Sequence, residues 1–289
     1  MIKINKKDIN LYDTIFSGQT FRITLENDKS ITIVLFDRVV NIKEVGNYLI
    51  IDSNKMLNLK SFITEYLDLN RDYNEINKYI ISIDDNLKKE IKKCEGYKIL
   101  KQNKFEMYIT YIISQNNNVK RITSIVNKLS QKYGEKVIFR NKEYYLFPTY
   151  ENLKDLTKED FRNLGLGFRD EYLVNALNKI KENNKFLDDL DKLSTNNAIR
   201  ELMSIKGIGL KVASCIMLFG YSRLDTFPID TWVRKYVSKN YNINDDIKVI
   251  SKFMKNKYNQ YSGLVIQYFY HTERNKKDWS LYKNVLKLN

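Results

Sequence analysis

The sequence contains few of the residues that build disulfide frameworks, metal sites and rigid turns. Its two cysteines, Cys94 and Cys215, lie far apart and form no CxxC pair, which excludes a disulfide framework and a cysteine metal site. We therefore expect no metal and no cofactor. Only two prolines, Pro148 and Pro228, interrupt 289 residues, and no low-complexity linker is present, so the helical part should form one compact body. The single histidine, His271, is interpreted as a solvated helix residue rather than a catalyst.

Long apolar runs are also missing. No stretch of about 18 apolar residues occurs, and the first seven residues lack the apolar segment of a signal peptide. We expect a monomeric cytoplasmic protein without membrane contact, associated with the nucleoid if it is prokaryotic.

Basic residues outnumber acidic ones. The chain has 49 Lys and Arg and 35 Asp and Glu, which gives a formal charge of +14. A polyanion is therefore the first partner to consider, and both nucleic acid and an anionic membrane qualify. An AT-rich genome, which favours Lys, Asn, Ile and Tyr, is the alternative source of this charge. The 43% of hydrophobic residues suffices for the core of one or two domains.

The first 55 or so residues have the pattern of strands. Phe21–Leu25 and Ile31–Phe36 are β-branched or aromatic with partial alternation, and residues 27–29 between them form a turn. Val39–Ile42 and Tyr48–Ile51 add two candidate strands. We predict a small antiparallel sheet.

Beyond residue 56 the apolar period becomes helical, as in Phe105, Tyr108, Ile109 and Ile112. The chain is therefore predicted to have an α+β fold. Residues 1–95 would form the sheet domain with accompanying helices, and residues 96–289 a mostly helical domain.

One segment of the helical part carries specific information. A helix predicted over Ala198–Ile205 is followed by Lys206-Gly207-Ile208-Gly209 and by a second apolar helix over Leu210–Phe219. The glycines permit a tight hairpin that brings backbone amides and the positive end of the second helix against a phosphate. This pattern favours DNA backbone binding without sequence specificity through Gly207 and Gly209.

The second of these helices contains an unexpected lysine. Lys211 and Ser214 are its only polar side chains, so the pattern predicts a partly buried lysine whose amine could act as a nucleophile. Helical spacing places Lys211, Ser214, Cys215 and Leu218 on one face, and Cys215 should line the same pocket. In the alternative interpretation, Lys211 binds a phosphate and Cys215 belongs to the core.

Asp230 lies nineteen residues after this lysine. It follows Pro228 and precedes an apolar run, which is the position of a helix N-cap. A capping role alone would explain it, but the combination with the hairpin and Lys211 points to a catalytic pair.

Together these segments resemble the HhH-GPD superfamily of DNA glycosylases, and within it the 8-oxoguanine DNA glycosylase/AP lyase family. Three further segments resemble that family: Phe16–Arg22 its SGQ-F-R motif, Ser114–Asn118 with Arg121 its Asn-rich insertion loop, and Leu164–Arg169 its wedge loop. The resemblance implies a helix-hairpin-helix glycosylase domain after the sheet. It also implies base excision repair of duplex DNA containing oxidised guanine, with the damaged base flipped out of the stack.

The resemblance assigns roles to individual residues. Lys211 would attack C1′ and form a Schiff base before β-elimination, and Asp230 would stabilise the developing sugar cation. In the base pocket, the Gly18 carbonyl would accept a hydrogen bond from N7-H. Cys215 would pack on one face of the base and Tyr270 on the other, and Pro228 would also belong to the pocket.

On the DNA, Asn116 would fill the vacated stack and Phe168 would wedge the opposite strand. Arg121 and Arg169 would contact the orphaned cytosine. The sequence departs from the family at Ile266, where a glutamine that reads the base edge is usual, and Gln267 follows one position later. One residue turns a helix by about 100°, so Gln267 is assigned to the pocket without inheriting that role directly. Trp232 stands where some relatives place a phosphate-binding histidine.

Three alternatives stay open at this point. Pyrimidine-specific relatives carry the lysine and aspartate, but many have a four-cysteine iron-sulfur loop, which two cysteines exclude. Monofunctional relatives for adenine or alkylated bases generally lack a lysine at position 211. A non-catalytic hairpin module would explain the glycines and the charge, but not the pairing of Lys211 with Asp230.

Overall fold

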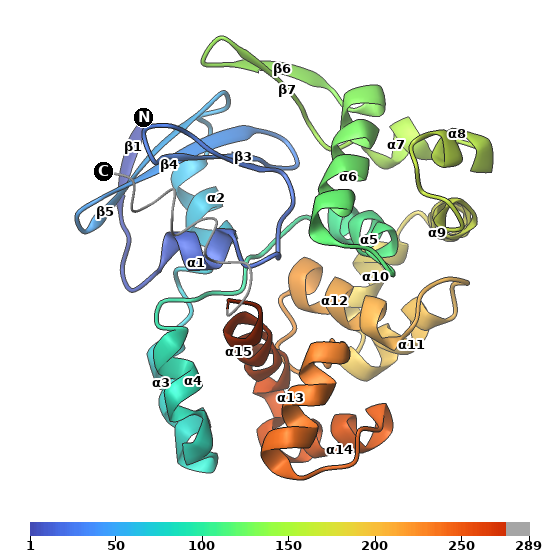
Figure 1. Ribbon diagram of the computed structural model, residues 1–289. Coiled ribbons are helices and arrows are strands. Elements are labelled where there is room, and N and C mark those ends of the chain that lie inside the picture. Colours follow the sequence, from blue (N-terminus) through green and yellow to red (C-terminus); the bar gives the residue numbers. More distant parts are fainter. Residues whose placement is uncertain (276–289) are drawn as a thin grey trace.

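The structure, a computed structural model, describes residues 1–275, with side chains through residue 272 (Figure 1). Its N-terminal part is a five-stranded sheet whose neighbouring strands are all antiparallel. In sheet order these strands are β1 (Ile2–Asn5), β5 (Tyr48–Ser53), β4 (Val39–Val45), β3 (Ile31–Val34) and β2 (Ile23–Leu25). The predicted hairpin and antiparallel sheet are confirmed, and β1 is an additional edge strand.

One face of the sheet is covered by α1 (Leu11–Ile15) and α2 (Leu59–Tyr66), as Figure 1 shows. Alternate residues of the strands point to this face because side chains alternate along a strand. Ile31 and Ile33 of β3 are fully buried, and they join Ile15 and Ile63 from the two helices in one hydrophobic cluster. This cluster fixes the sheet against its helices.

The rest of the described chain is mostly helical, as predicted. Its helices are α3 (Tyr73–Ile83), α4 (Lys88–Lys93), α5 (Lys104–Ile113), α6 (Val119–Tyr133), α7 (Tyr150–Leu153), α8 (Lys158–Asn163), α9 (Arg169–Glu182), α10 (Phe186–Lys192), α11 (Thr195–Met203), α12 (Leu210–Tyr221), α13 (Thr231–Tyr241), α14 (Ile247–Tyr258) and α15 (Ser262–Asn275), with short 3₁₀ turns at Asp85–Leu87 and Asn259–Tyr261. The hairpin of β6 (Lys136–Phe139) and β7 (Lys142–Tyr145) projects from them and was not predicted.

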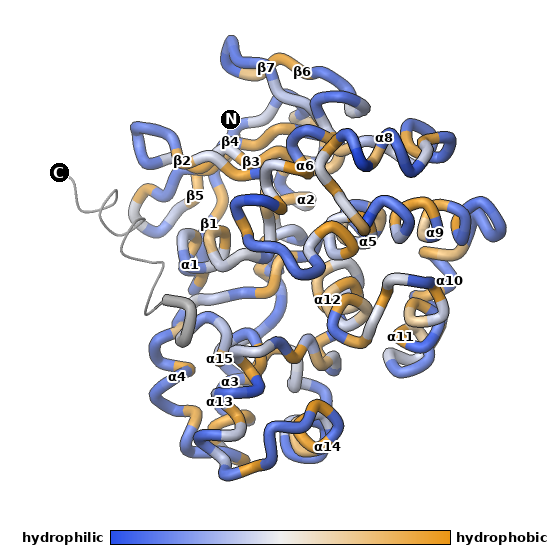
Figure 2. The backbone as a smooth tube through the Cα atoms, turned by 45° about the vertical axis from the view of Figure 1, so that its right-hand side comes forward, coloured by the Kyte–Doolittle hydropathy of each residue, from blue (hydrophilic) through white to orange (hydrophobic). Residues whose placement is uncertain are grey.

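The helices share one large hydrophobic core. Figure 2 shows α12 as a largely hydrophobic segment, whereas the tip of the β6–β7 hairpin is hydrophilic. Apolar side chains of α3 and α4 belong to this core, and α4 packs against α15. The helices before residue 95 pack with helices after it. The predicted domain boundary at this position therefore stays a prediction. Within residues 1–275, each helix is too short or too polar to cross a lipid bilayer.

Candidate active site

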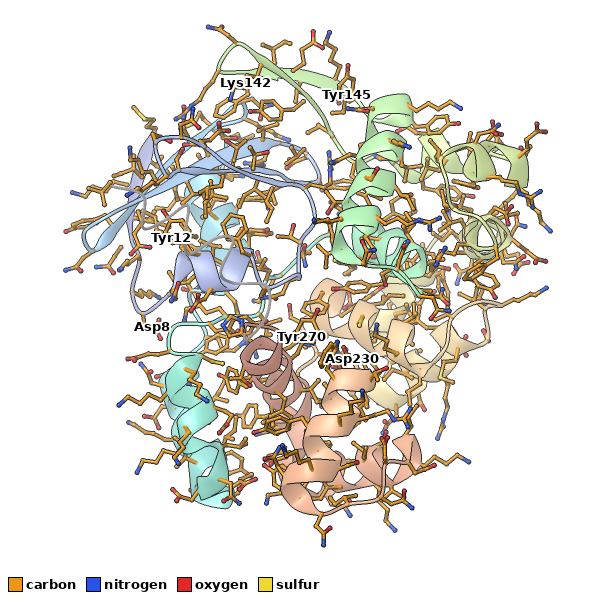
Figure 3. All side chains as sticks on the ribbon, in the orientation of Figure 1. Asp8, Tyr12, Lys142, Tyr145, Asp230 and Tyr270 are labelled. Carbon is orange, nitrogen blue, oxygen red and sulfur yellow. The ribbon has the colours of Figure 1, made fainter. Side chains whose placement is uncertain are left out.

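One pocket gathers all the residues predicted for catalysis and for the damaged base. It opens among α5, α12, α13, α15 and the loop after α1, and it has a volume of about 670 Å³ including its open mouth. Figure 3 shows two of its residues, Asp230 and Tyr270, near each other at the centre of the molecule. The predicted residues that line it are Gly18, Lys211, Cys215, Pro228, Asp230, Gln267 and Tyr270.

Lys211 stands at the mouth of this pocket, in the first turn of α12. The prediction that its side chain is partly buried is wrong, because Lys211 is exposed while Val212–Phe219 are all buried. The helix begins at the surface, immediately after Gly209, so its first turn meets solvent before the chain enters the core. The amine is therefore accessible to a substrate without a change in the fold.

The face of α12 that lines the pocket is formed by Lys211, Cys215 and Phe219, at intervals of four residues. Ser214 and Leu218, which helical spacing places near the lysine on α12, do not line the pocket, whereas Cys215 does, as predicted. Ser214 and Leu218 are both fully buried in the core. Among the described residues, the Ser214 hydroxyl has no hydrogen-bond partner.

Cys215 lines the pocket together with the two residues predicted to be catalytic. Burial raises the pKa of its thiol to about 12, and the charges of Lys211 and Asp230 act on it in opposite directions. The thiol therefore stays protonated at neutral pH and offers a small polarisable surface rather than a nucleophile.

Asp230 caps α13, as predicted from its position after Pro228. Its Oδ1 accepts a hydrogen bond of 2.8 Å from the backbone N–H of Val233. The residue is half-buried and lines the pocket, so its second oxygen is available to a ligand there. Capping and a role in the pocket are compatible at this position.

The last described helix, α15, supplies the inner wall. Ile266, Gln267 and Tyr270 all line the pocket, and Ile266 is fully buried whereas Gln267 is 8% exposed. The interpretation of His271 as a solvated residue is wrong, because it is 3% exposed. Its ring lies 4.9 Å from that of Tyr97, since position 271 faces the N-terminal part of the chain rather than solvent.

The predicted hairpin joins α11 to α12. Gly207 has φ +98°, and a Cβ there would lie 2.2 Å from the ring of Tyr172. A glycine is therefore required both by the backbone conformation and by this close approach. Gly209 is the N-cap residue of α12, and a Cβ there would meet no atom within 4 Å. The start of α12 thus presents an open backbone surface suited to a phosphate.

Two loops meet beside the pocket mouth. Arg169 is 4% exposed and donates hydrogen bonds to the backbone carbonyls of Gln115, Asn116 and Leu166. Arg121 donates to the Gly165 carbonyl over 3.2 Å. The insertion loop, residues 114–118, and the wedge loop, residues 164–169, are therefore tied to each other. Asn116 and Phe168 remain exposed at their tips.

Comparison with known proteins agrees with this geometry. The family model described as 8-oxoguanine DNA glycosylase, N-terminal domain, matches residues 1–108, and that of the HhH-GPD superfamily base excision DNA repair proteins matches residues 109–258. The structure also resembles the crystal structure of an 8-oxoguanine glycosylase/lyase from Clostridium acetobutylicum in complex with dsDNA containing cytosine opposite 8-oxoG. Their TM-score is 0.88 at 34% sequence identity, over 96% of this chain and 98% of that one. The chain belongs to the 8-oxoguanine DNA glycosylase family.

Two eukaryotic members of the family resemble part of the chain. The N-glycosylase/DNA lyase of Arabidopsis thaliana is 31% identical over 52% of this chain, and that of Saccharomyces cerevisiae is 32% identical over 57% of it. The chain spans less than half the length of these two relatives, 42% and 47% respectively.

Three aromatic residues in the pocket of this family member were not predicted from the sequence. Tyr111 stacks on Phe219 with ring centroids 5.4 Å apart, and Phe21 packs edge-on against Tyr111 at 6.4 Å. Phe21 belongs to residues 16–22, a segment that the sequence indicated as a family motif without a role for this residue. Tyr111 and Phe219 follow the apolar period of their helices and were indistinguishable from core residues. Within residues 1–275, no three His, Cys, Asp or Glu side chains gather as a metal site requires.

Proposed function

We propose that this protein is a bifunctional DNA glycosylase/AP lyase of base excision repair that removes 8-oxoguanine from duplex DNA. The observation that carries the proposal is the convergence of an exposed lysine, Lys211, and a half-buried aspartate, Asp230, on one pocket beside a hairpin with open backbone amides. A relative with 34% identity was crystallised with DNA containing cytosine opposite 8-oxoguanine. The charge of +14 suits a DNA partner.

The proposed chemistry begins at the sugar of the flipped nucleotide. Lys211, once its amine has lost a proton, attacks C1′ as the N-glycosidic bond breaks and the base leaves with the bonding electrons. The carboxylate of Asp230 stabilises the positive charge that develops on the sugar. Ring opening then yields a Schiff base between the Lys211 nitrogen and C1′. Loss of a C2′ proton expels the 3′ phosphate, and the strand is cut by β-elimination.

The pocket supports the assignment of a purine substrate. Cys215 and Tyr270 line it from different helices, and we propose that they contact opposite faces of the base. The Gly18 carbonyl would accept from N7-H, which oxidised guanine has and guanine lacks. We further propose that the protein acts as a monomer on chromosomal DNA in the cytoplasm.

A substrate panel tests the proposal. Duplexes containing 8-oxoguanine, thymine glycol or an alkylated purine are incubated with the protein, and the products are separated on a denaturing gel. We expect cleavage at 8-oxoguanine to be fastest. Preference for thymine glycol or the alkylated purine would assign a different damaged base, and cleavage of none with intact duplex binding would indicate a non-catalytic hairpin protein.

The nucleophile is tested by borohydride trapping on 8-oxoguanine DNA. Lys211→Gln should abolish the covalent complex, because reduction captures only a Schiff base formed by an amine at the lesion. Lys206→Gln is the matched control, since Lys206 lies in the same hairpin, is exposed and pairs with Glu171 rather than facing the pocket. Undiminished trapping by Lys211→Gln would assign the chemistry to another amine.

A further inference from the structure

The polar side chains that line the pocket differ in whether their hydrogen-bonding groups are already used. The hydroxyls of Ser17 and Ser114 each donate to a backbone carbonyl over 2.8 Å. The Asn117 amide nitrogen donates to another carbonyl over 3.2 Å, and the Gln267 carboxamide meets a buried tyrosine hydroxyl at 3.5 Å. The Tyr111 hydroxyl, in contrast, forms no hydrogen bond with the residues that the structure describes. Because Tyr111 is only 6% exposed, this is an uncommon state for a polar group.

The hydroxyl of Tyr111 is open to the pocket. The ring stacks on Phe219 with centroids 5.4 Å apart and meets the edge of Phe21 at 6.4 Å, so it is held in place by aromatic neighbours. The hydroxyl of the preceding residue, Thr110, is enclosed in the core without a partner. That of Tyr111 is not enclosed, and the small exposed surface of this residue lies in the pocket.

The phenol of Tyr111 keeps its proton. Burial raises its pKa well above the ordinary value of 10, and the nearby groups of Cys215, Tyr270 and Tyr97 raise it further. A neutral hydroxyl can rotate, and it offers one donor and two acceptor positions. The pocket therefore contains an unused group that can either donate or accept a hydrogen bond.

Tyr111 lies toward the inner end of the pocket. Lys211 stands at the mouth, and Phe219, on which Tyr111 stacks, follows it by eight residues on the same helix. An α-helix rises 1.5 Å per residue, so these two levels are about 12 Å apart along the axis of α12. A nucleotide whose C1′ reaches Lys211 therefore directs its purine toward Tyr111.

The neighbours of Tyr111 indicate which part of the purine it meets. Phe21, which packs against it, follows Gly18 by three residues in the segment between α1 and β2, and both line the pocket. The Gly18 carbonyl is proposed to accept from N7-H of the oxidised base. On a purine, N7 and the substituent at C6 lie on the same edge, and this substituent is an oxygen in guanine and an amino group in adenine. The C6 substituent therefore faces the wall that contains Tyr111.

We propose that the Tyr111 hydroxyl contacts the C6 substituent of the flipped base, donating to the oxygen of 8-oxoguanine and accepting from the amino group of 8-oxoadenine. The pocket then receives 8-oxopurines as a class, with 8-oxoadenine as a second substrate. N7-H is common to both bases, so the Gly18 contact does not separate them. This inference rests on the proposed function, because it concerns the base that the same pocket receives.

The test compares single-turnover excision of 8-oxoguanine, 8-oxoadenine and 8-oxopurine, each opposite cytosine. 8-Oxopurine carries hydrogen at C6 and cannot form the proposed contact. We expect the unchanged protein to excise the first two at rates of the same order of magnitude, and 8-oxopurine at least about tenfold more slowly than either, the scale of one lost hydrogen bond. An 8-oxoadenine rate as low as that of 8-oxopurine would contradict the proposed second substrate.

Tyr111→Phe removes the hydroxyl alone. It should slow excision of 8-oxoguanine and of 8-oxoadenine by about tenfold each and leave 8-oxopurine unchanged, because the coupling between two groups disappears when either is absent. Thermal stability should not fall, since the hydroxyl has no partner in the described part of the protein. Equal slowing of all three bases, or of none, would overturn the contact with C6.

Tyr108→Phe is the matched control. Tyr108 lies one turn earlier on α5, is fully buried, and donates to the Ala176 carbonyl over 3.1 Å rather than lining the pocket. This variant should lose thermal stability and keep the relative rates of the three bases. A changed preference in Tyr108→Phe equal to that in Tyr111→Phe would show that the effect is structural.

The comparison of the three bases in the unchanged protein needs no variant, so the inference stays testable if Tyr111→Phe does not fold. Excision of 8-oxoguanine alone would overturn this inference and leave the proposed function intact. Excision of none of the three bases would instead contradict the proposed function.

Discussion

Asp230 combines the capping of a helix with a position in the pocket. One oxygen caps α13 through Val233, which satisfies a backbone N–H that the helix leaves unpaired at its first turn. The other is available to the pocket. Because the cap fixes the side chain, the carboxylate is held in place before a substrate arrives, and this is the condition under which a fixed charge lowers an activation barrier.

Asp230→Asn separates the two functions, because asparagine is an equally good N-cap but carries no charge. We expect duplex binding and thermal stability to stay close to those of the unchanged protein. Base release in a single turnover should slow by about 100-fold or more, corresponding to about 3 kcal/mol. Asp246→Asn, at the cap of α14, is the control and should leave duplex binding, thermal stability and base release unchanged. Unfolding of the Asp230 variant would instead favour a purely structural aspartate.

At the same scale, the sequence predicted the identity of the pocket residues better than their burial. Lys211, Cys215 and Asp230 were found by helical spacing and capping rules. The exposure of Lys211 was not, because a helix of apolar residues looks buried throughout while its first turn starts at the surface.

Among elements, the insertion loop and the wedge loop form one unit. Arg169 fills the space between them and binds carbonyls of both, and Arg121 at the start of α6 reaches across to Gly165. The two arginines differ in accessibility, because Arg169 is buried and Arg121 is exposed. Desolvation, followed by the nearby charge of Arg121, lowers the pKa of Arg169. That both contact an orphaned cytosine stays a prediction.

We expect excision opposite cytosine to be faster than opposite adenine or thymine. The difference in activation free energy should be about 1 to 3 kcal/mol, since a guanidinium can donate to both O2 and N3 of cytosine. Arg121→Ala should reduce this preference. Arg169→Ala should do so too and also slow excision opposite every base, because it releases both loops. Lys120→Ala, which removes an exposed neighbouring charge, should weaken binding to all duplexes alike. Equal single-turnover rates opposite all four bases in the unchanged protein would refute the prediction.

The elements themselves were largely predictable. Four strands of the sheet and the helices around the hairpin follow from alternation, helical period and glycine placement. The strand β1 and the β6–β7 hairpin were missed because they are short, and polar residues interrupt their apolar pattern. Their pairing partners, rather than their own sequence, make them strands.

For the whole molecule, a buried ion pair joins the N-terminal sheet to the helical body. Arg22, next to β2, lies 3.8 Å from Glu106 of α5 and also donates to the Tyr145 carbonyl of β7. Burial raises the pKa of Glu106 from its ordinary 4.5 to about 7, and the charge of Arg22 opposes this rise only in part. A raised pKa means that the folded state binds the proton of Glu106 more tightly than the unfolded state does. The stability that this proton contributes is complete below pH 4.5 and is lost as pH rises through about 7.

Glu106→Gln should therefore flatten the dependence of stability on pH. Between pH 4.5 and pH 8, the free energy of unfolding of the unchanged protein should fall by about 3 kcal/mol more than that of the variant. Denaturant titrations at several pH values measure the difference. Glu75→Gln, an exposed carboxylate on α3, should behave like the unchanged protein. Parallel pH profiles for Glu106→Gln and the unchanged protein would show that Glu106 ionises as an exposed carboxyl does.

Tyr172 joins two parts that are expected to act on different DNA strands. Its ring leaves no room for a Cβ at Gly207 of the hairpin, and it packs edge-on against Phe168 of the wedge loop at 5.8 Å. Tyr172 therefore holds the hairpin, which is expected to bind one DNA backbone, at a fixed spacing from the wedge loop, which is expected to enter the other strand. We expect each base pair that reaches this surface to meet the hairpin and the wedge loop in the same encounter. An intact pair should resist distortion and a weakened pair should yield to it, so we expect the local stiffness of the duplex to set how long the protein pauses there.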